Sequence, residues 1–221
     1  MARVLEPEVM DTKADAEEYD AMNFVEPNTR FAVDALSLLG AVAKPEILDV
    51  GTGTARIPIL MVERRPDLSI LGIDLAREML RVAEANVSAA GFGRQIRLEL
   101  TDAKRLALAT DRFDMVTCNS TIHHLPDPLL GFREIERVTK PGGAIMIRDL
   151  VRPPTPEDAW AIVEAAAAGE SKHQKQLFFD SLRASLTLDD VRRALERVGL
   201  EELSVKMVSD RHWTAEGRKP D

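Results

Sequence analysis

The sequence predicts an α/β fold: a doubly wound, mostly parallel sheet of seven strands with helices on both faces. Between about residues 46 and 149, short apolar segments alternate with segments of helical periodicity, which is typical of parallel strands joined by helices. The first apolar segment ends in a Gly-x-Gly turn, as buried strands that lead into a helix often do. Two further short strands near the C-terminus predict an antiparallel edge.

The chain has 221 residues, of which 45% are hydrophobic and 30% charged, so one soluble domain with a sizeable core is expected. We expect this domain to span 1–221. An N-terminal helical cap would occupy 1–44, the α/β core 45–150, inserted helices 151–186, and a C-terminal helix with edge strands 187–221.

The elements up to residue 149 follow from periodicity and from glycine and proline positions. A helical pattern from about Ala14 to Gly40 is broken near Asn23 to Pro27, which predicts two helices. Strands are predicted at Ile47–Val50, Ser69–Ile73, Ile96–Leu100, Phe113–Asn119 and Ala144–Asp149. Helices are predicted at Ala55–Arg65, Arg77–Ala90 and Asp127–Thr139, and Pro141-Gly142-Gly143 is expected to form a turn.

After Asp149 the alternation changes, and three prolines at 153, 154 and 156 indicate a connector. Two helices are expected near 157–168 and 172–185, beside the carboxyl ends of the strands, where open parallel sheets bind ligands. Thr187 and Asp190 are spaced as a capping box that begins a third helix, which ends at Gly199. The antiparallel pair is placed at Leu203–Val208 and His212–Ala215.

Charge and cysteine content limit the choice of partners and compartment. The formal net charge is −8 and no dense Lys/Arg run occurs, so nucleic acid is not an expected partner. The single cysteine, Cys118, cannot form an internal disulfide, and the acidic N-terminus lacks the apolar stretch of a signal peptide. No apolar run approaches membrane-spanning length. We therefore expect a cytoplasmic location.

The segment ILDVGTGTARIPI, Ile47 to Ile59, is the first candidate binding feature. Its glycines let the backbone approach a ligand, and the helix that follows offers free N–H groups. A dinucleotide fingerprint would place a third glycine where Arg56 stands, and Arg56 would obstruct a pyrophosphate. Asp49, two residues before Gly51, suits a cationic ligand better than a diphosphate.

Four more segments follow in a fixed order. Asp74 ends the second strand, where a carboxylate can accept both hydroxyls of a ribose; a helix N-cap is the alternative role. Asp102 follows the third strand as either a ligand contact or a turn residue. Next come FDMVTCNSTIHHLPDP, with His123 and His124, and the PGGAIMI segment.

Together these five segments resemble the class I S-adenosylmethionine-dependent methyltransferases, especially the small-molecule group that includes ubiquinone/menaquinone-type C-methyltransferases. The resemblance implies S-adenosylmethionine as the cofactor and roles for particular residues. The turn Gly51-Thr52-Gly53 would face the methionine part, with Asp49 beside its ammonium group. Asp74 would hold the ribose, with Leu75 against the adenine, and Asp102 and Ala103 would bind the adenine ring. Asn119 and Ser120 would border the sulfonium.

The resemblance also has departures and weaker implications. Many relatives carry a third glycine in the first motif where this chain has Ala55, which is small enough that no loss of binding is expected. Similar enzymes fold an N-terminal helix with Tyr and Arg over the cofactor, and Tyr19, Asn28 and Arg30 are the candidates here.

The histidine pair is the candidate catalytic feature. A hydroxyl acceptor needs a base, and histidine has a suitable pKa, so His123 or His124 is the expected base. Neighbouring side chains of an extended backbone point in opposite directions, so one ring at most should face the acceptor. His123 is favoured, and His124 should pack against the Pro126-Asp127-Pro128 turn. No metal is expected, because adjacent residues rarely converge on one ion and no Cys/His set accompanies them.

The expected function is therefore methyl transfer from S-adenosylmethionine to a small-molecule acceptor by in-line displacement. Three alternatives stay open: a methyltransferase acting on protein or RNA, a nicotinamide-dependent Rossmann oxidoreductase, and a non-catalytic cofactor-binding protein. The missing third glycine and the absence of a Tyr-x-x-x-Lys pair oppose the oxidoreductase, since Tyr19 is the only tyrosine. The oligomeric state and the methylated atom do not follow from the residues.

Overall fold

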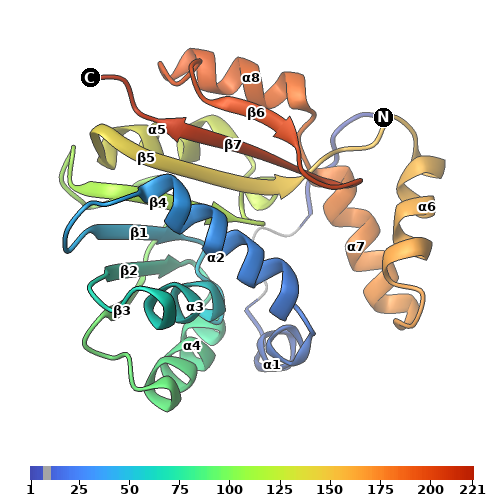
Figure 1. The fold of residues 1–221 in the computed structure, drawn as a ribbon. Helices are drawn as coiled ribbons and strands as arrows, with labels where there is room; N and C mark the ends of the chain where they lie inside the picture. The colour runs from blue at the N-terminus through green and yellow to red at the C-terminus, as the bar shows by residue number, and fades with distance from the viewer. Residues whose placement is uncertain (7–10) are drawn as a thin grey trace.

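A computed structural model describes residues 1–6 and 11–221; residues 7–10, part of the predicted helical cap over 1–44, lie outside the described residues. The described residues form a seven-stranded sheet in the order β3-β2-β1-β4-β5-β7-β6 (Figure 1). Its strands are β1 (Glu46–Val50), β2 (Ser69–Asp74), β3 (Ile96–Leu100), β4 (Phe113–Asn119), β5 (Thr139–Leu150), β6 (Ser204–Met207) and β7 (His212–Arg218). The first five run parallel, and β7 pairs antiparallel with both β5 and β6. The predicted fold class is confirmed, including the antiparallel edge.

Helices pack on both faces of the sheet. One face is covered by α2 (Val25–Leu39), α3 (Arg56–Arg64) and α4 (Arg77–Ala90). The other is covered by α5 (Pro128–Val138) and α8 (Leu188–Arg197). The Thr187–Asp190 capping box that begins α8 is present with both of its hydrogen bonds, as predicted.

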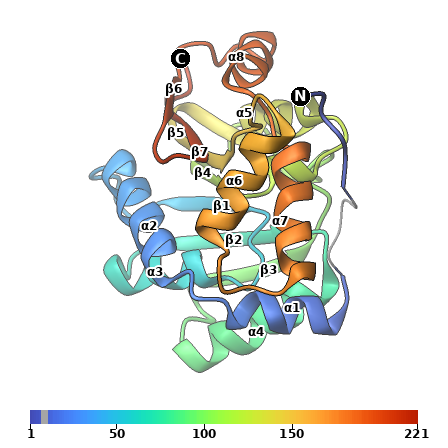
Figure 2. The same ribbon diagram turned by 90° about the vertical axis from the view of Figure 1, so that its right-hand side faces the viewer.

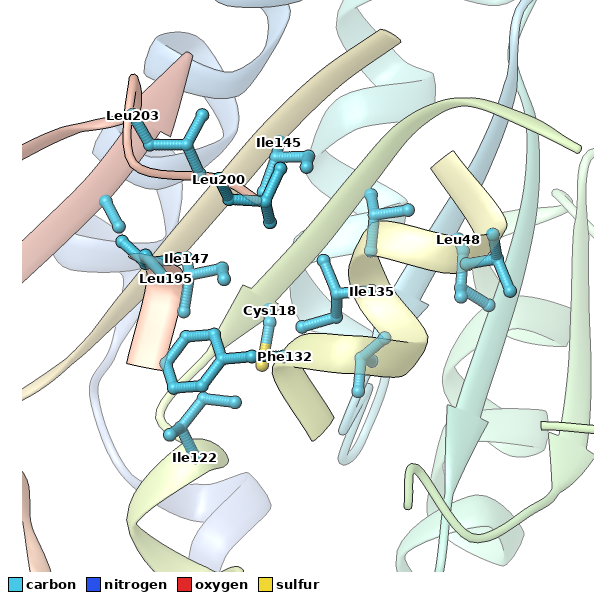
Figure 3. Close-up of a cluster of buried hydrophobic side chains, with 14 of the residues drawn as sticks. Leu48, Cys118, Ile122, Phe132, Ile135, Ile145, Ile147, Leu195, Leu200 and Leu203 are labelled. Atoms are coloured by element: carbon cyan, nitrogen blue, oxygen red, sulfur yellow. The ribbon is translucent and has the colours of Figure 1, made fainter. Parts of the chain in front are cut away.

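The two cores follow from the alternation of side chains along each strand. On β1, Leu48 and Val50 pack with α5 and α8, whereas Ile47 packs with α2 and α3. Because both faces of these parallel strands are buried, their sequences are nearly continuous runs of apolar residues. Figure 3 shows Phe132 of α5 beside Cys118 of β4 in the first core, where the thiol is fully buried.

Three helices lie across the carboxyl ends of the parallel strands (Figure 2). They are α1 (Lys13–Ala21), α6 (Pro156–Ala166) and α7 (Lys172–Ala184). Trp160 of α6 stacks on Phe179 of α7, with ring centroids 4.5 Å apart, which joins these two helices into a hairpin. The arrangement is the cover over the strand ends that the sequence suggested. Within the described part of the chain, no helix combines the length and apolar character needed to cross a bilayer.

Strand β5 begins earlier than predicted. The Pro141-Gly142-Gly143 segment was expected to be a turn before a strand at Ala144, but it lies inside β5. Phe113 pairs with Thr139 and Met115 with Ala144, so the extra residues are accommodated by a register shift. Gly142 has a φ of 68°, and a residue in this left-handed conformation makes such a bulge possible.

Candidate active site

A cavity opens where the carboxyl ends of β1, β2 and β4 meet beneath α1. It measures about 800 Å³ together with the part open to solvent. Among the sequence-predicted site residues, Gly51, Gly53, Asp74, Leu75, Asp102, Ala103, Asn119, Ser120 and His124 line it. The others, Asp49, Thr52 and His123, are buried next to the wall rather than on it.

The glycine turn after β1 needs its glycines for two separate reasons. Gly51 and Gly53 have φ values of 68° and 54°, where residues with a Cβ are strained. A Cβ on Gly51 would also lie 2.0 Å from Thr121 Oγ1. Ala55, which replaces the family's third glycine, has a φ of 60° and so occupies the same strained region, at a cost of about 1–2 kcal/mol.

Asp49 is buried directly beneath this turn. Its side chain is 3% exposed and accepts a hydrogen bond from Thr117 Oγ1 at 2.7 Å. Burial raises the pKa of Asp49 to about 6. No lysine or arginine in residues 1–6 and 11–221 forms an ion pair with it. A buried carboxylate without a cation favours a positively charged ligand above it.

Asp74 lies at the end of β2, on the cavity wall. It accepts hydrogen bonds from the N–H of Gly53 at 2.8 Å and from that of Ala76 at 2.9 Å. Burial raises its pKa despite these two donors. Because α4 has Ala76 as its N-cap, Asp74 holds the turn before the helix and is not the helix cap. The carboxylate thus links the glycine turn to the end of β2.

The loop after β3 supplies Asp102 and Ala103. Asp102 accepts the N–H of Lys104 and pairs with its ammonium group, both at 2.9 Å. Burial alone would raise the pKa of Asp102, but these contacts lower it overall. Asp102 therefore stabilises the turn after β3 and also lies on the cavity wall, so the two alternative roles are compatible.

The end of β4 forms the cavity floor with Asn119, Ser120 and Thr121. Ser120 has a φ of 53°, which turns the chain sharply out of the strand. The sequence places Thr121 in the expected floor segment, 119–122, but does not predict its contact with the glycine turn. Its side chain fills the space that a Cβ on Gly51 would need, a relation between two loops that local sequence patterns do not reveal.

The two histidines occupy different environments on η1 (Ile122–His124), a single 3₁₀ turn. His123 is 4% exposed; its Nδ1 lies 2.5 Å from Asp149 Oδ1, and its backbone N–H donates to the other carboxylate oxygen. Burial alone would lower the pKa of His123, but Asp149 raises it overall. His124 is the ring on the cavity wall.

The expected direction of the two rings is wrong. The 3₁₀ turn brings their centroids to 4.1 Å instead of pointing them apart. The favoured His123 is the packed ring, held by Asp149, and His124 faces the cavity instead of the Pro126-Asp127-Pro128 turn. The error arose because an extended backbone was assumed after β4.

The N-terminal segment contributes contacts that local sequence patterns do not predict. Arg3 donates to the carbonyl oxygens of His123 at 3.0 Å and Leu125 at 2.8 Å, and also to that of Ala184 at the end of α7. Glu6 Oε1 lies 3.0 Å from His124 Nδ1 and 3.4 Å from His123 Nε2. These first residues therefore connect α7 to the histidine turn (Figure 2).

Helix α1 covers the cavity from the other side. Tyr19 lines the cavity, and its ring lies above Gly53. Asp20 forms a two-point pair with Arg56 of α3 at 2.6 and 2.9 Å, which gives Arg56 a structural partner. Asn28 and Arg30, the other lid candidates, lie on α2 outside the residues that line the cavity.

Comparison with known proteins identifies the family. A family model described as a methyltransferase domain matches residues 42–208. The chain belongs to this methyltransferase family. The predicted resemblance to class I S-adenosylmethionine-dependent methyltransferases is thereby confirmed, and S-adenosylmethionine is the cofactor. The uncompensated charge of Asp49 beneath a cavity built from the glycine turn and Asp74 fits this cationic ligand.

Two curated relatives illustrate the range of similar proteins. Methyltransferase GfsG of Streptomyces halstedii is 28% identical over 186 residues, which cover 84% of this methyltransferase and 63% of GfsG. The ubiquinone/menaquinone biosynthesis C-methyltransferase UbiE of Geotalea daltonii is 32% identical over 125 residues, or 56% of this chain and 52% of UbiE. The chain thus spans about half to two thirds of the length of these relatives.

Solved structures agree with the fold. A SAM-dependent methyltransferase from Aquifex aeolicus superposes with a TM-score of 0.68 at 18% identity, over 94% of this methyltransferase and 98% of that chain. An N-methyltransferase of Haemonchus contortus, solved with S-adenosylhomocysteine, gives a TM-score of 0.73 at 18% identity, over 95% and 58% respectively. At these identities the likeness concerns the fold alone.

Proposed function

We propose that this methyltransferase transfers a methyl group from S-adenosylmethionine to a small-molecule acceptor by in-line displacement. The observation that carries the proposal is the cavity at the carboxyl ends of β1, β2 and β4, with the buried carboxylate of Asp49 beneath its glycine turn. A negative charge at this depth favours a cofactor that carries both an ammonium and a sulfonium group.

In this proposal, different residues of the cavity wall bind different parts of the cofactor. The turn Gly51-Thr52-Gly53 holds the methionine part, and Asp49 attracts its ammonium group from below. Asp74 accepts the ribose hydroxyls, and Leu75 covers the adenine. Asp102 and Ala103 bind the adenine edge. Asn119 and Ser120 border the sulfonium, since they form the floor at the end of β4.

Bound S-adenosylmethionine supplies a methyl group that its sulfonium already activates. The protein's contribution is then mainly alignment of the acceptor, which can be worth about 7–11 kcal/mol. Helix α1 covers the cavity through Tyr19 and would limit the access of water to the cofactor. His123 and His124 are the proposed catalytic residues: an acceptor hydroxyl would lose its proton at this pair, next to His124 on the cavity wall.

A small acceptor is favoured by the acidic charge and by the relatives. Those at 27–32% identity include a 27-O-demethylrifamycin SV methyltransferase of Amycolatopsis mediterranei and UbiE. A net charge of −8 disfavours a phosphate backbone as the substrate. We further propose that the enzyme acts in the cytoplasm, where an unpaired thiol such as Cys118 stays reduced. The acidic net charge supports the proposal that it acts without nucleic acid.

Calorimetric titration with S-adenosylmethionine and NAD tests the cofactor site. We expect binding of the first only, and a loss of about 1.5–3 kcal/mol in Asp74→Ala, because the charge-assisted hydrogen bonds disappear. Asp210→Ala, which removes an exposed carboxylate far from the cavity, is the matched control and should bind normally. Binding of NAD alone would overturn the proposal.

The acceptor is identified in a second experiment. The enzyme is incubated with a metabolite extract and labelled S-adenosylmethionine, and the labelled products are identified by mass. We expect a low-molecular-mass product that Asp74→Ala no longer forms. Label found only in protein or RNA would replace the small-molecule acceptor with a macromolecular one.

A further inference from the structure

Three donor atoms converge beside the cavity from opposite ends of the described chain. They are Glu6 Oε1, His123 Nε2 and His124 Nδ1, and all three lie within 4.8 Å of one another. The carboxylate oxygen is 3.4 Å from the first nitrogen and 3.0 Å from the second. Tetrahedral ligands about 2.0–2.1 Å from one zinc ion are about 3.3–3.4 Å apart, so these two distances are close to those within a coordination shell.

Two of these atoms lack a well-formed partner. Glu6 Oε1 and His124 Nδ1 are buried from solvent, and neither has an aligned hydrogen bond although they face each other. Leaving a buried polar atom unsatisfied costs about 1–3 kcal/mol. A cation between the three donors would satisfy both atoms at once.

Two of the three side chains are held by a second partner on the far side. His123 Nδ1 contacts Asp149 Oδ1 at 2.5 Å, which directs the other ring nitrogen toward Glu6. Glu6 Oε2 accepts a hydrogen bond from Ser181 Oγ of α7 at 3.0 Å, which leaves Oε1 turned toward the histidines. Partners of this kind orient the ligands in metal sites and raise their basicity.

We propose that Glu6, His123 and His124 bind a divalent transition-metal ion, with zinc as the representative ion. Two imidazole nitrogens and one carboxylate oxygen are a ligand set that zinc accepts with a fourth position open. The negative charges of Glu6 and Asp149 balance the ion.

The position of the site suggests what the ion does. His124 lies on the cavity wall, so the ion would be bound next to the space where an acceptor would enter. A hydroxyl that binds a divalent ion loses its proton to solvent more readily. With the ion bound, the two histidines would therefore act as its ligands instead of taking the proton themselves. The sequence alone predicts no metal here, because the side chains of adjacent histidines seldom converge on one ion. The 3₁₀ turn and the arrival of Glu6 remove that objection.

The test uses the full chain, stripped of metal with a chelator and titrated with Zn²⁺ by calorimetry. We expect one equivalent to bind. Glu6→Gln keeps the size of the side chain and removes its charge, and it should weaken binding at least tenfold. Asp149→Asn leaves all three ligands in place but changes the partner that orients His123, and in the folded variant it should weaken binding about 10–100-fold.

The matched control is His173→Gln, which removes an exposed histidine of α7 outside the cluster and should leave Zn²⁺ affinity unchanged. Thermal unfolding of each variant verifies that it folds. Cobalt(II) substitution adds a spectroscopic readout: the visible absorption of the bound ion should change in Glu6→Gln and persist in His173→Gln.

Three results would overturn the proposal. They are no stoichiometric zinc binding by the wild type, equal affinity in Glu6→Gln, and loss of binding in His173→Gln. None of these depends on methyl transfer, since S-adenosylmethionine binding is measured separately. A failure of the metal site is therefore distinguishable from a failure of the proposed function.

Discussion

Asp49 on β1 and Asp149 on β5 are buried to the same depth, with 3% and 1% of their side chains exposed, yet their environments differ. Asp49 has the Thr117 hydroxyl as a donor, and burial raises its pKa to about 6. Asp149 accepts from the His123 ring and from the N–H groups of His123 and Leu150. Burial would raise the pKa of Asp149 too, but His123 and these donors lower it.

The difference is whether the charge of the buried carboxylate is compensated within the protein or only by a bound ligand. The charge of Asp149 is compensated within the chain, so Asp149 stabilises the fold and orients His123. The charge of Asp49 is compensated by no cation among the described residues, so the folded protein carries a cost that a cationic cofactor would offset. Variants that remove each charge should therefore act in opposite directions.

The largest expected effect is on the free energy of unfolding of Asp149→Asn. Breaking a buried pair costs about 3–5 kcal/mol. Because the pKa of Asp149 is lowered and that of His123 is raised, both groups are charged at about pH 6, and the contribution decreases as the pH rises through the folded pKa of His123. Urea unfolding at about pH 6 measures it. The matched variant Asp49→Asn should be as stable as the wild type or more stable. Equal losses in both variants would erase the distinction.

The second effect is the pH dependence of stability that Asp49 causes. Its pKa rises from the ordinary aspartate value of 3.8 to about 6 in the folded protein, so between pH 4 and 6 the unfolded state releases the proton first. Stability should therefore fall by up to about 3 kcal/mol as the pH rises through this window and stay level above it. The difference between wild type and Asp49→Asn in urea isolates this contribution. A constant difference from pH 4 to 7 would contradict it.

The third effect concerns cofactor affinity. Asp49→Asn should weaken S-adenosylmethionine binding by about 1.5–3 kcal/mol at pH 8, because the charge beneath the ammonium group is lost. In the wild type, affinity should fall as the pH drops below about 6, where Asp49 becomes protonated. Calorimetry from pH 5 to 8 follows both trends. Asp49→Asn should show a flatter profile, and an identical profile would place the controlling charge elsewhere.

The parts of the fold that the sequence could predict are those set by neighbouring residues. The strand that ends in Gly51, the helix that stops at Gly91 and the Thr187–Asp190 capping box each depend on a few consecutive positions. The start of β5 was wrong because the glycine pair of PGG was interpreted as a turn, whereas pairing with β4 extends the strand through it. At this position, pairing with β4 determines the structure more strongly than the turn preference of Pro-Gly-Gly.

The site shows the same limit. Most of the predicted wall residues line the cavity, because strand ends of a parallel sheet meet at one edge. Glu6 and Asp149 were missed as partners of the histidines, since they come from distant segments and no local spacing connects them. Arg56 had no assigned partner for the same reason: Asp20 reaches it from α1. The roles of the individual site residues stay predictions.

The smallest expected effect tests the hydroxyl that supports Asp49. Thr117→Val removes the donor to Asp49 and should cost about 1–1.5 kcal/mol of stability at pH 8, where the carboxylate is ionised. The loss should be smaller at pH 4, because a hydrogen bond to the neutral acid is weaker.

Thr139→Val is the matched control. The buried hydroxyl of Thr139 donates to the carbonyl oxygen of Ile135, so the stability lost in this variant should not depend on pH. Without this donor the pKa of Asp49 should rise further, and the midpoint of the fall in stability should move to higher pH. An unchanged midpoint in urea unfolding would mean that Thr117 does not stabilise the ionised form of Asp49.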